Sequence, residues 1–387
     1  MFPALRDAID HAQISVHLET YIFKLDRSGR DILEALQRAS RRGVAVRVVL
    51  DGFGSADDAE ALRHEIESAG GLCRIYRPEP RWFRWVLIHT DRLRRLHRKI
   101  TIVDGETAFI GGINIEDDFV DTSDESHRLE PRYDYAVRIK GPVVTDAIRA
   151  VNQLWLRLNW AQVGRSLASW RRFRKQFQAR VLPSETAGPM RAKGRTVTAG
   201  LVLRDNLRYR HSIEQVYLHF IHQAQHDIII ANAYFLPGRR LRHALMAAVK
   251  RGVRVRLLLQ GRVEYRLQSH ATRWIYDQFL NAGVEILEYM PSHLHGKVAV
   301  MDNMSTVGSS NLDPFSLLLA REANVVVYDI DFAEQLRHSL EHAIQRGSVV
   351  IDQAAHHRRP FILRSLDALA YLLVRFGVAM TGKGLDD

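Results

Sequence analysis

One short stretch occurs twice in the chain and constrains its fold more than any other feature. The first copy runs from His97 through Lys99 to Asp104, and a turn of small residues then leads to Asn114. The apolar residues between the lysine and the aspartate predict a strand that enters a turn. Because residues two apart in a strand point to the same face, the histidine and the lysine should share one face.

The second copy lies about half a chain length later and has the same spacing. It consists of His295, Lys297 and Asp302, and Asn311 follows after a turn of small residues. The flanking segments also repeat in order, so that the apolar run 253–259 matches the run 44–50. The repeat therefore covers a whole domain. Alternating strands and helices predict an α/β fold in which neighbouring strands are largely parallel.

The duplication predicts the domain organisation. We expect an N-terminal domain over 1–163, a basic linker over 164–196, a C-terminal domain over 197–345 and an amphipathic tail over 346–387. The second half begins with a strand, 197–203, for which the first half has no counterpart. We therefore expect the native start to lie upstream of Met1.

The charge of the chain indicates an anionic partner. The net charge is +11, which favours phosphate groups, nucleic acid or an acidic membrane surface. The single cysteine, Cys73, excludes an intramolecular disulfide and a cysteine-rich metal site. The first residues lack the layout of a signal peptide, and no apolar run has the length that spans a bilayer.

Paired histidines, lysines and asparagines suit displacement at a phosphodiester. Lys99, Lys297, Asn114 and Asn311 can donate to its charged oxygens. One histidine can attack phosphorus while the other protonates the departing oxygen. No metal or other cofactor is needed, because the lysines neutralise charge, and a zinc site is a poor match since lysine is not a usual zinc ligand.

Further candidate residues flank the two motifs. Asp134 and Glu322 each open the strand after a motif, where either could hold an imidazole in the required tautomer. Asp104 and Asp302 belong to the catalytic motifs by position, although bracing of the turn explains them better than contact with substrate. Glu19 ends a strand and could contact substrate or cap a turn.

The duplicated motif resembles that of the phospholipase D superfamily. The flanking runs Leu-Glu-Thr-Tyr-Ile-Phe from Leu18, Leu-Asp-Gly-Phe-Gly-Ser from Leu50 and Gly-Ser-Ser-Asn-Leu-Asp from Gly308 resemble bacterial cardiolipin synthases of the short B type. Two departures stand out. Gly112 occupies a position where many members have serine, and the second motif has one residue fewer between its aspartate and the following glycine.

The resemblance implies two α-β-α sandwich domains related by pseudo-twofold symmetry, with one active site between them. It implies a phosphatidyl-histidine intermediate and transfer to the headgroup hydroxyl of phosphatidylglycerol, with phosphatidylethanolamine as a further candidate substrate. It favours His97 as the nucleophile and His295 as the general acid. It also implies a peripheral protein on the cytoplasmic side of the bacterial cell membrane, bound to an anionic surface, with nucleic acid a less fitting partner.

Two alternatives for the function stay open. A phospholipase D-type phosphodiesterase or nuclease would use the same residues and a basic groove. A non-catalytic protein that binds phospholipid or nucleic acid fits less well, because both motifs are intact. Two segments could bind a membrane surface or dock on their own domain, namely 361–380 and the arginine-rich 165–180.

Overall fold

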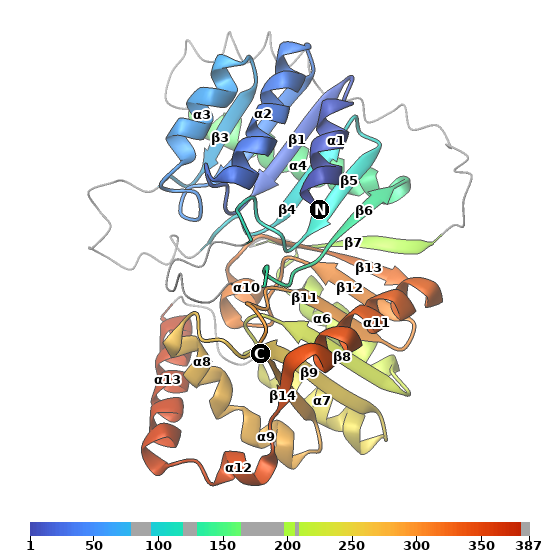
Figure 1. Ribbon diagram of the computed structural model, residues 1–387, viewed down its shortest axis with the longest axis vertical. Helices are drawn as coiled ribbons and strands as arrows, with labels where there is room; N and C mark the ends of the chain where they lie inside the picture. Colours follow the sequence, from blue (N-terminus) through green and yellow to red (C-terminus); the bar gives the residue numbers. More distant parts are fainter. Residues whose placement is uncertain (79–93, 119–129, 164–196, 206–208, 381–387) are drawn as a thin grey trace.

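The computed structural model describes residues 1–78, 94–118, 130–163, 197–205 and 209–380. It confirms the predicted α/β class, with two sheets that each carry one copy of the motif (Figure 1). The expected linker 164–196, including the candidate helix 165–180, lies outside the described residues. The domain boundaries stay a prediction.

The first half contains a six-stranded sheet in the order β3-β2-β1-β4-β5-β6. Its strands are β1 Ser15–Thr20, β2 Ala45–Asp51, β3 Leu72–Tyr76, β4 Lys99–Val103, β5 Thr107–Gly111 and β6 Ala136–Lys140. Its helices are α1 Phe2–Asp10, α2 Arg27–Arg41, α3 Ala59–Ser68 and α4 Pro142–Val163. The apolar stripes of α1 to α3 pack on one face of the sheet, because they bury residues such as Leu5, Leu36 and Leu62.

The second half contains an eight-stranded sheet in the order β14-β10-β9-β8-β11-β12-β13-β7. Its strands are β7 Thr198–Arg204, β8 Asp227–Asn232, β9 Arg254–Gln260, β10 Glu285–Tyr289, β11 Lys297–Met301, β12 Met304–Gly308, β13 Glu322–Tyr328 and β14 Ser348–Val350. Its helices are α6 Ser212–Gln223, α7 Arg239–Lys250, α8 Arg266–Trp274, α9 Tyr276–Asn281, α10 Pro314–Leu318, α11 Ile330–Gly347, α12 Gln353–His357 and α13 Phe361–Ala379.

The expectation that neighbouring strands are largely parallel is wrong. Among the described strands, β1, β2 and β3 pair in parallel in the first half and β8, β9 and β10 in the second. The motif strands β4 and β11 instead pair antiparallel with both of their neighbours. The tight turn after each motif strand dictates its pairing with the following strand, since a hairpin can only join antiparallel strands.

The motif aspartates build these hairpin turns. Asp104 and Asp302 adopt positive φ angles of 51° and 52°, a conformation that aspartate tolerates better than most residues. The carboxylate of Asp104 accepts hydrogen bonds from the backbone N–H groups of residues 13, 14 and 15. Asp302 does the same for residues 225, 226 and 227. Each aspartate therefore ties its hairpin to the start of the adjacent strand.

The two motifs differ in length only within this turn. Val103 pairs with Thr107 across the first turn, whereas Met301 pairs with Met304 across the second. The additional residue of the first motif thus lies in the turn itself. It leaves the rest of the two hairpins in the same register.

The two halves share an apolar core. Ile100 and Ile102 of β4 pack in one cluster with Ala323, Val325 and Val327 of β13, together with side chains of α4. A second cluster joins Tyr133 and Tyr135 of the first half to residues of β11 and α11. The motif strands of both halves therefore meet at the interface rather than at the outer faces.

The C-terminal segment is part of the second half. Strand β14 pairs with β10 at the edge of the sheet, and α13 packs along α8 (Figure 1). Asp367 of α13 is buried, with Nδ1 of His270 at 2.7 Å and a guanidinium nitrogen of Arg359 at 2.8 Å. Within the described ranges no helix is both long and apolar enough to cross a membrane.

Replacing Asp104 by alanine should destabilise the protein, because three backbone N–H groups lose their acceptor at a turn that alanine adopts poorly. We expect a loss of about 2 kcal/mol in the free energy of unfolding, measured by chemical denaturation. Asp31→Ala, at an exposed position of α2, serves as the matched control. Equal stability of the two variants would contradict the bracing role.

Candidate active site

Backbone pairing across the interface sets the positions of the motif histidines. The N–H of His97 donates to the carbonyl of Arg321, and the N–H of Arg321 donates to the carbonyl of Arg95. At the other side the N–H of His295 donates to the carbonyl of Tyr133, whose own N–H donates to the carbonyl of His293. Each histidine therefore pairs with the residue directly before a carboxylate of the other half. Arg321 precedes Glu322, and Tyr133 precedes Asp134.

The two histidines and two carboxylates form crossed pairs. Nδ1 of His97 lies 3.0 and 3.1 Å from the carboxylate oxygens of Glu322. Nδ1 of His295 lies 2.6 Å from Oδ2 of Asp134. Both carboxylates are buried behind the imidazoles. They hold the proton on Nδ1 and leave Nε2 of each ring for chemistry.

The crossed pairs are similar but not identical. Oγ of Ser309 donates to Glu322 at 2.5 Å and so orients the longer glutamate. The first half has Gly112 at the corresponding place, where a Cβ atom would lie 2.4 Å from Oδ1 of Asp134. The glycine that departs from the family pattern therefore makes room for the carboxylate that binds His295.

Both histidines line one open cavity at the interface. Asn114 and Asn311 also line it, and their carboxamide oxygens have no hydrogen-bond partner within the described residues. Three further cations line the wall, Lys24, Arg95 and Arg132. The cavity therefore presents two imidazoles and two amides to a ligand, a set that suits a phosphodiester. Carboxylates also line it, and Glu116 is paired with both Lys24 and Arg132.

The motif lysines lie one layer behind this wall. Nζ of Lys99 donates to the carbonyl of His97 at 2.7 Å, and Nζ of Lys297 donates to the carbonyl of His295. Both side chains are buried. Each lysine thus binds the backbone of its own histidine.

Burial shifts the protonation of the whole site. Desolvation, and secondarily the charge of Lys297, lowers the pKa of Lys99 to about 7. Desolvation lowers the pKa of Lys297 to about 8. The pKa of His295 falls to about 4 and that of His97 also falls, in both cases mainly because burial disfavours the imidazolium. An anionic phosphodiester would raise all four pKa values, because it favours the charged forms.

Three residues predicted for the site contact neither the cavity nor the motif histidines. Asp104 and Asp302 sit at the far ends of β4 and β11, where they bind backbone N–H groups. Glu19 is fully buried and binds Arg98 at 2.5 Å and His17 at 3.2 Å, so the structure does not bring it to the ligand. Asp134 and Glu322 contact the histidines rather than the cavity.

Several cavity residues were not singled out from the sequence. Glu116 and Asp313 each stand two residues after a motif asparagine, and Tyr234 matches Tyr21 in the repeat, so the duplication could have indicated all three. Arg132 and Tyr265 also line the wall and have no such counterpart. The carboxylate of Asp313 accepts from the N–H groups of Phe315 and Ser316, so it caps α10, and burial raises its pKa to about 7.

The described part of the chain contains no group of three or more histidine, cysteine, aspartate or glutamate side chains arranged to hold a metal ion.

A family model described as "Cardiolipin synthase, PLD-like domain" matches residues 5–153 and 217–344. The chain belongs to this phospholipase D-like family. It is 38% identical over 382 residues to cardiolipin synthase B of Shigella flexneri, covering 98% of this chain and 87% of the relative. It is 28% identical over 374 residues to cardiolipin synthase 1 of Staphylococcus epidermidis, covering 96% and 71%. The predicted resemblance is confirmed.

Solved structures share the fold at low sequence identity. The crystal structure of phosphatidylserine synthase from Haemophilus influenzae Rd KW20 matches with a TM-score of 0.68 and 15% identity, covering 98% of this chain and 92% of that one. Polyphosphate kinase from Porphyromonas gingivalis matches with a TM-score of 0.52 and 13% identity, covering 98% and 51%. These likenesses show the two-sheet fold alone.

The depressed lysine pKa values predict a pH dependence of anion binding. Both lysines are charged below their pKa values of about 7 and about 8 and lose that charge as the pH rises through them. Affinity for glycerophosphoglycerol, a diester whose own charge is constant in this range, should fall by about tenfold between about pH 6.5 and 9. Isothermal titration calorimetry measures it.

Lys297→Arg provides the control, since the guanidinium stays charged throughout this range. Its affinity should fall less than that of the unmodified protein over the same interval. An unmodified protein whose affinity does not change with pH would contradict the assigned lysine pKa values.

Proposed function

We propose that the protein is a cardiolipin synthase that transfers a phosphatidyl group from one phospholipid to the headgroup hydroxyl of phosphatidylglycerol. The observation that carries this proposal is the pair of histidines on one cavity, each held by a carboxylate of the other half. The names of the relatives with 38% identity support the same reaction. Phosphatidylglycerol, or phosphatidylethanolamine, would donate the phosphatidyl group.

The first step forms a covalent intermediate. Nε2 of one neutral histidine attacks phosphorus, and the bond from phosphorus to the headgroup oxygen breaks. The protonated second histidine gives its proton to that oxygen, so the headgroup leaves as a neutral alcohol. The phosphodiester itself raises the depressed pKa of the second histidine when it binds, which supplies the proton where it is needed.

The second step reverses these roles. The second histidine, now neutral, takes the proton from the hydroxyl of phosphatidylglycerol while that oxygen attacks phosphorus. The phosphorus–nitrogen bond breaks, and the first histidine returns to its neutral form. Lys99, Lys297, Asn114 and Asn311 stabilise the charge on the non-bridging oxygens in both steps. We assign His97 as nucleophile and His295 as acid, in keeping with the family resemblance.

Purified protein with labelled phosphatidylglycerol in vesicles tests the reaction. His97→Ala and His295→Ala should each lower cardiolipin formation by at least about a thousandfold, because each removes a reacting group. His64→Ala, at an exposed position of α3, is the matched control and should keep the activity. Phosphatidic acid as the only product would instead indicate a hydrolase, and cleavage of single-stranded DNA without lipid turnover would overturn the lipid assignment.

A donor with an activated leaving group separates the two histidines. Such a donor needs no proton, so loss of the acid should still permit a phosphatidyl-enzyme adduct, whereas loss of the nucleophile should not. Mass spectrometry of the trapped protein detects the adduct. An adduct in His97→Ala and none in His295→Ala would reverse our assignment.

The substrates reside in a membrane, and α13 offers a surface that suits one. The polar stripe of α13 faces the protein, where Asp367 is buried and the hydroxyl of Tyr371 accepts from Arg242 and Arg375. The opposite stripe is apolar and exposed, with Phe361 83% and Phe376 65% exposed. Its other members are Ile362, Leu366, Leu369, Leu372, Leu373 and Met380. A large exposed apolar face marks an interaction surface.

This outer face fits an interfacial helix rather than a spanning one. The apolar stripe would enter the headgroup region of the bilayer while the net charge of +11 is attracted to anionic lipid. We therefore place the protein peripherally on the cytoplasmic side of the bacterial cell membrane, with α13 in contact with the lipid.

The double variant Leu372→Glu, Phe376→Glu should bind vesicles containing phosphatidylglycerol at least about tenfold more weakly, because two side chains no longer enter the bilayer. Vesicle co-sedimentation measures the binding. The control is Val349→Glu, Val350→Glu, which adds the same charges at exposed positions of β14. Equal binding by both double variants, with the fold retained, would mean that the outer face of α13 does not contact lipid.

A further inference from the structure

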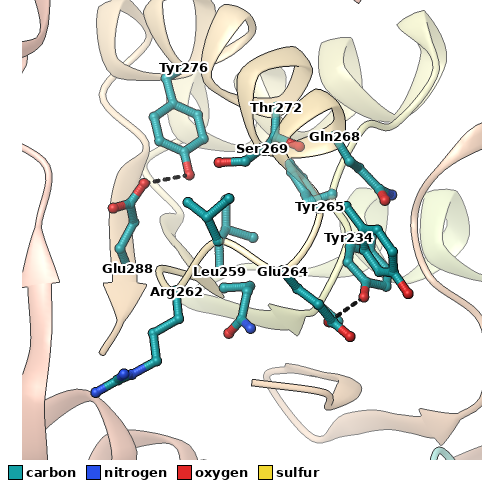
Figure 2. A pocket seen from close by; sticks show the side chains of 14 residues that line it. Tyr234, Leu259, Arg262, Glu264, Tyr265, Gln268, Ser269, Thr272, Tyr276 and Glu288 are labelled. Atoms are coloured by element: carbon teal, nitrogen blue, oxygen red, sulfur yellow. Dashed lines mark hydrogen bonds between the residues drawn. The ribbon is translucent and has the colours of Figure 1, made fainter. Parts of the chain in front are cut away.

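A narrow polar slot adjoins the catalytic cavity within the second half. Figure 2 shows it between α8, the end of β9 and β10. Four residues line both the slot and the cavity, namely Tyr234, Glu264, Tyr265 and Gln268. The slot is therefore a side branch of the site in which the histidines lie.

The interior of the slot is rich in groups that form neutral hydrogen bonds. Ser269 and Thr272 of α8 present hydroxyls, and Gln268 presents an amide (Figure 2). Opposite them, the hydroxyl of Tyr276 lies 3.3 Å from Glu288. Burial and the nearby Glu288 raise the pKa of Tyr276 well above its ordinary value, so this hydroxyl keeps its proton.

The buried carboxylate of the slot is already compensated by a cation, and the carboxylate at the entrance accepts a neutral hydrogen bond. A guanidinium nitrogen of Arg273 lies 3.3 Å from the buried carboxylate of Glu288. Glu264, at the entrance, accepts the hydroxyl proton of Tyr234 at 2.5 Å. A buried ammonium group would need an uncompensated carboxylate, and a phosphate would need free cations. A neutral group with several hydroxyls therefore matches the hydrogen-bonding groups of the slot better than an ammonium group or a phosphate does.

The slot is fixed to the segment that carries His295. The side chain of Gln260, which lines the slot, lies 2.8 Å from Nδ1 of His293 and accepts the N–H of Leu294 at 2.6 Å. His295 follows directly in the chain. The slot therefore lies near His295, the histidine that we assign as acid and base. This histidine gives its proton to the oxygen of the leaving headgroup.

We propose that this slot binds the glycerol headgroup of the donor lipid, whose oxygen leaves phosphorus in the first step. The proposal rests on the proposed phosphatidyl transfer. It assigns a specificity role to Ser269, Thr272 and Gln268, which would bind the free hydroxyls of the leaving glycerol.

The first test compares rates. Ser269→Ala with Thr272→Val removes two hydroxyls at nearly constant size, and Ser68→Ala with Thr198→Val is the matched control at exposed positions. With labelled phosphatidylglycerol in vesicles, the rate of glycerol release should fall by about tenfold for each hydrogen bond that the leaving headgroup loses. A rate equal to that of the control, with the melting temperature retained, would overturn the proposal.

The second test needs no turnover and therefore separates this proposal from the proposed function. Saturation-transfer NMR with glycerol as probe should detect binding to the unmodified protein and a loss of that binding in the double variant. Ser269→Phe, which fills the slot, should abolish it as well. Binding of ethanolamine in place of glycerol would overturn the polyol assignment. Glycerol binding without any lipid turnover would refute the transferase and leave the slot standing.

Discussion

The catalytic arrangement depends on two short backbone pairings between the halves, at Arg321 beside His97 and at Tyr133 beside His295. They place each imidazole against the carboxylate that follows on the opposite side. Main-chain hydrogen bonds are rigid and insensitive to side-chain motion, so the histidines gain a fixed orientation before any ligand arrives. The shared apolar core of β4, β13 and α4 then holds the two halves together beside these backbone pairings.

The site is built in layers. Histidines and asparagines face the cavity, carboxylates and lysines lie behind them, and the lysines bind the carbonyls of their own histidines. Burial makes the charged forms costly while the cavity is empty. A phosphodiester supplies the missing negative charge. The same low-dielectric surroundings that depress the pKa values strengthen each contact once the anion is bound.

The sequence predicted the repeated elements well and their tertiary partners poorly. The duplication singled out the histidines, lysines and asparagines, because two copies of a motif with the same spacing are improbable by chance. It could not show that Asp134, which follows the first motif, binds His295 of the second, since that pairing exists only across the interface. The prediction that neighbouring strands are largely parallel was wrong at the hairpins that contain Asp104 and Asp302. Slot residues such as Thr272 and Tyr276 belong to no repeat and had no signal.

The exchange of Ser309 for Gly112 has an evolutionary meaning. If two separate copies of one polypeptide formed such a site, both sides would have to carry the same residue, and any substitution would appear twice. Fusion of the copies into one chain removes that obligation. Here one side pairs serine with Glu322 and the other pairs glycine with the shorter Asp134. The two histidines can therefore drift toward different tasks while the symmetric frame around them is preserved.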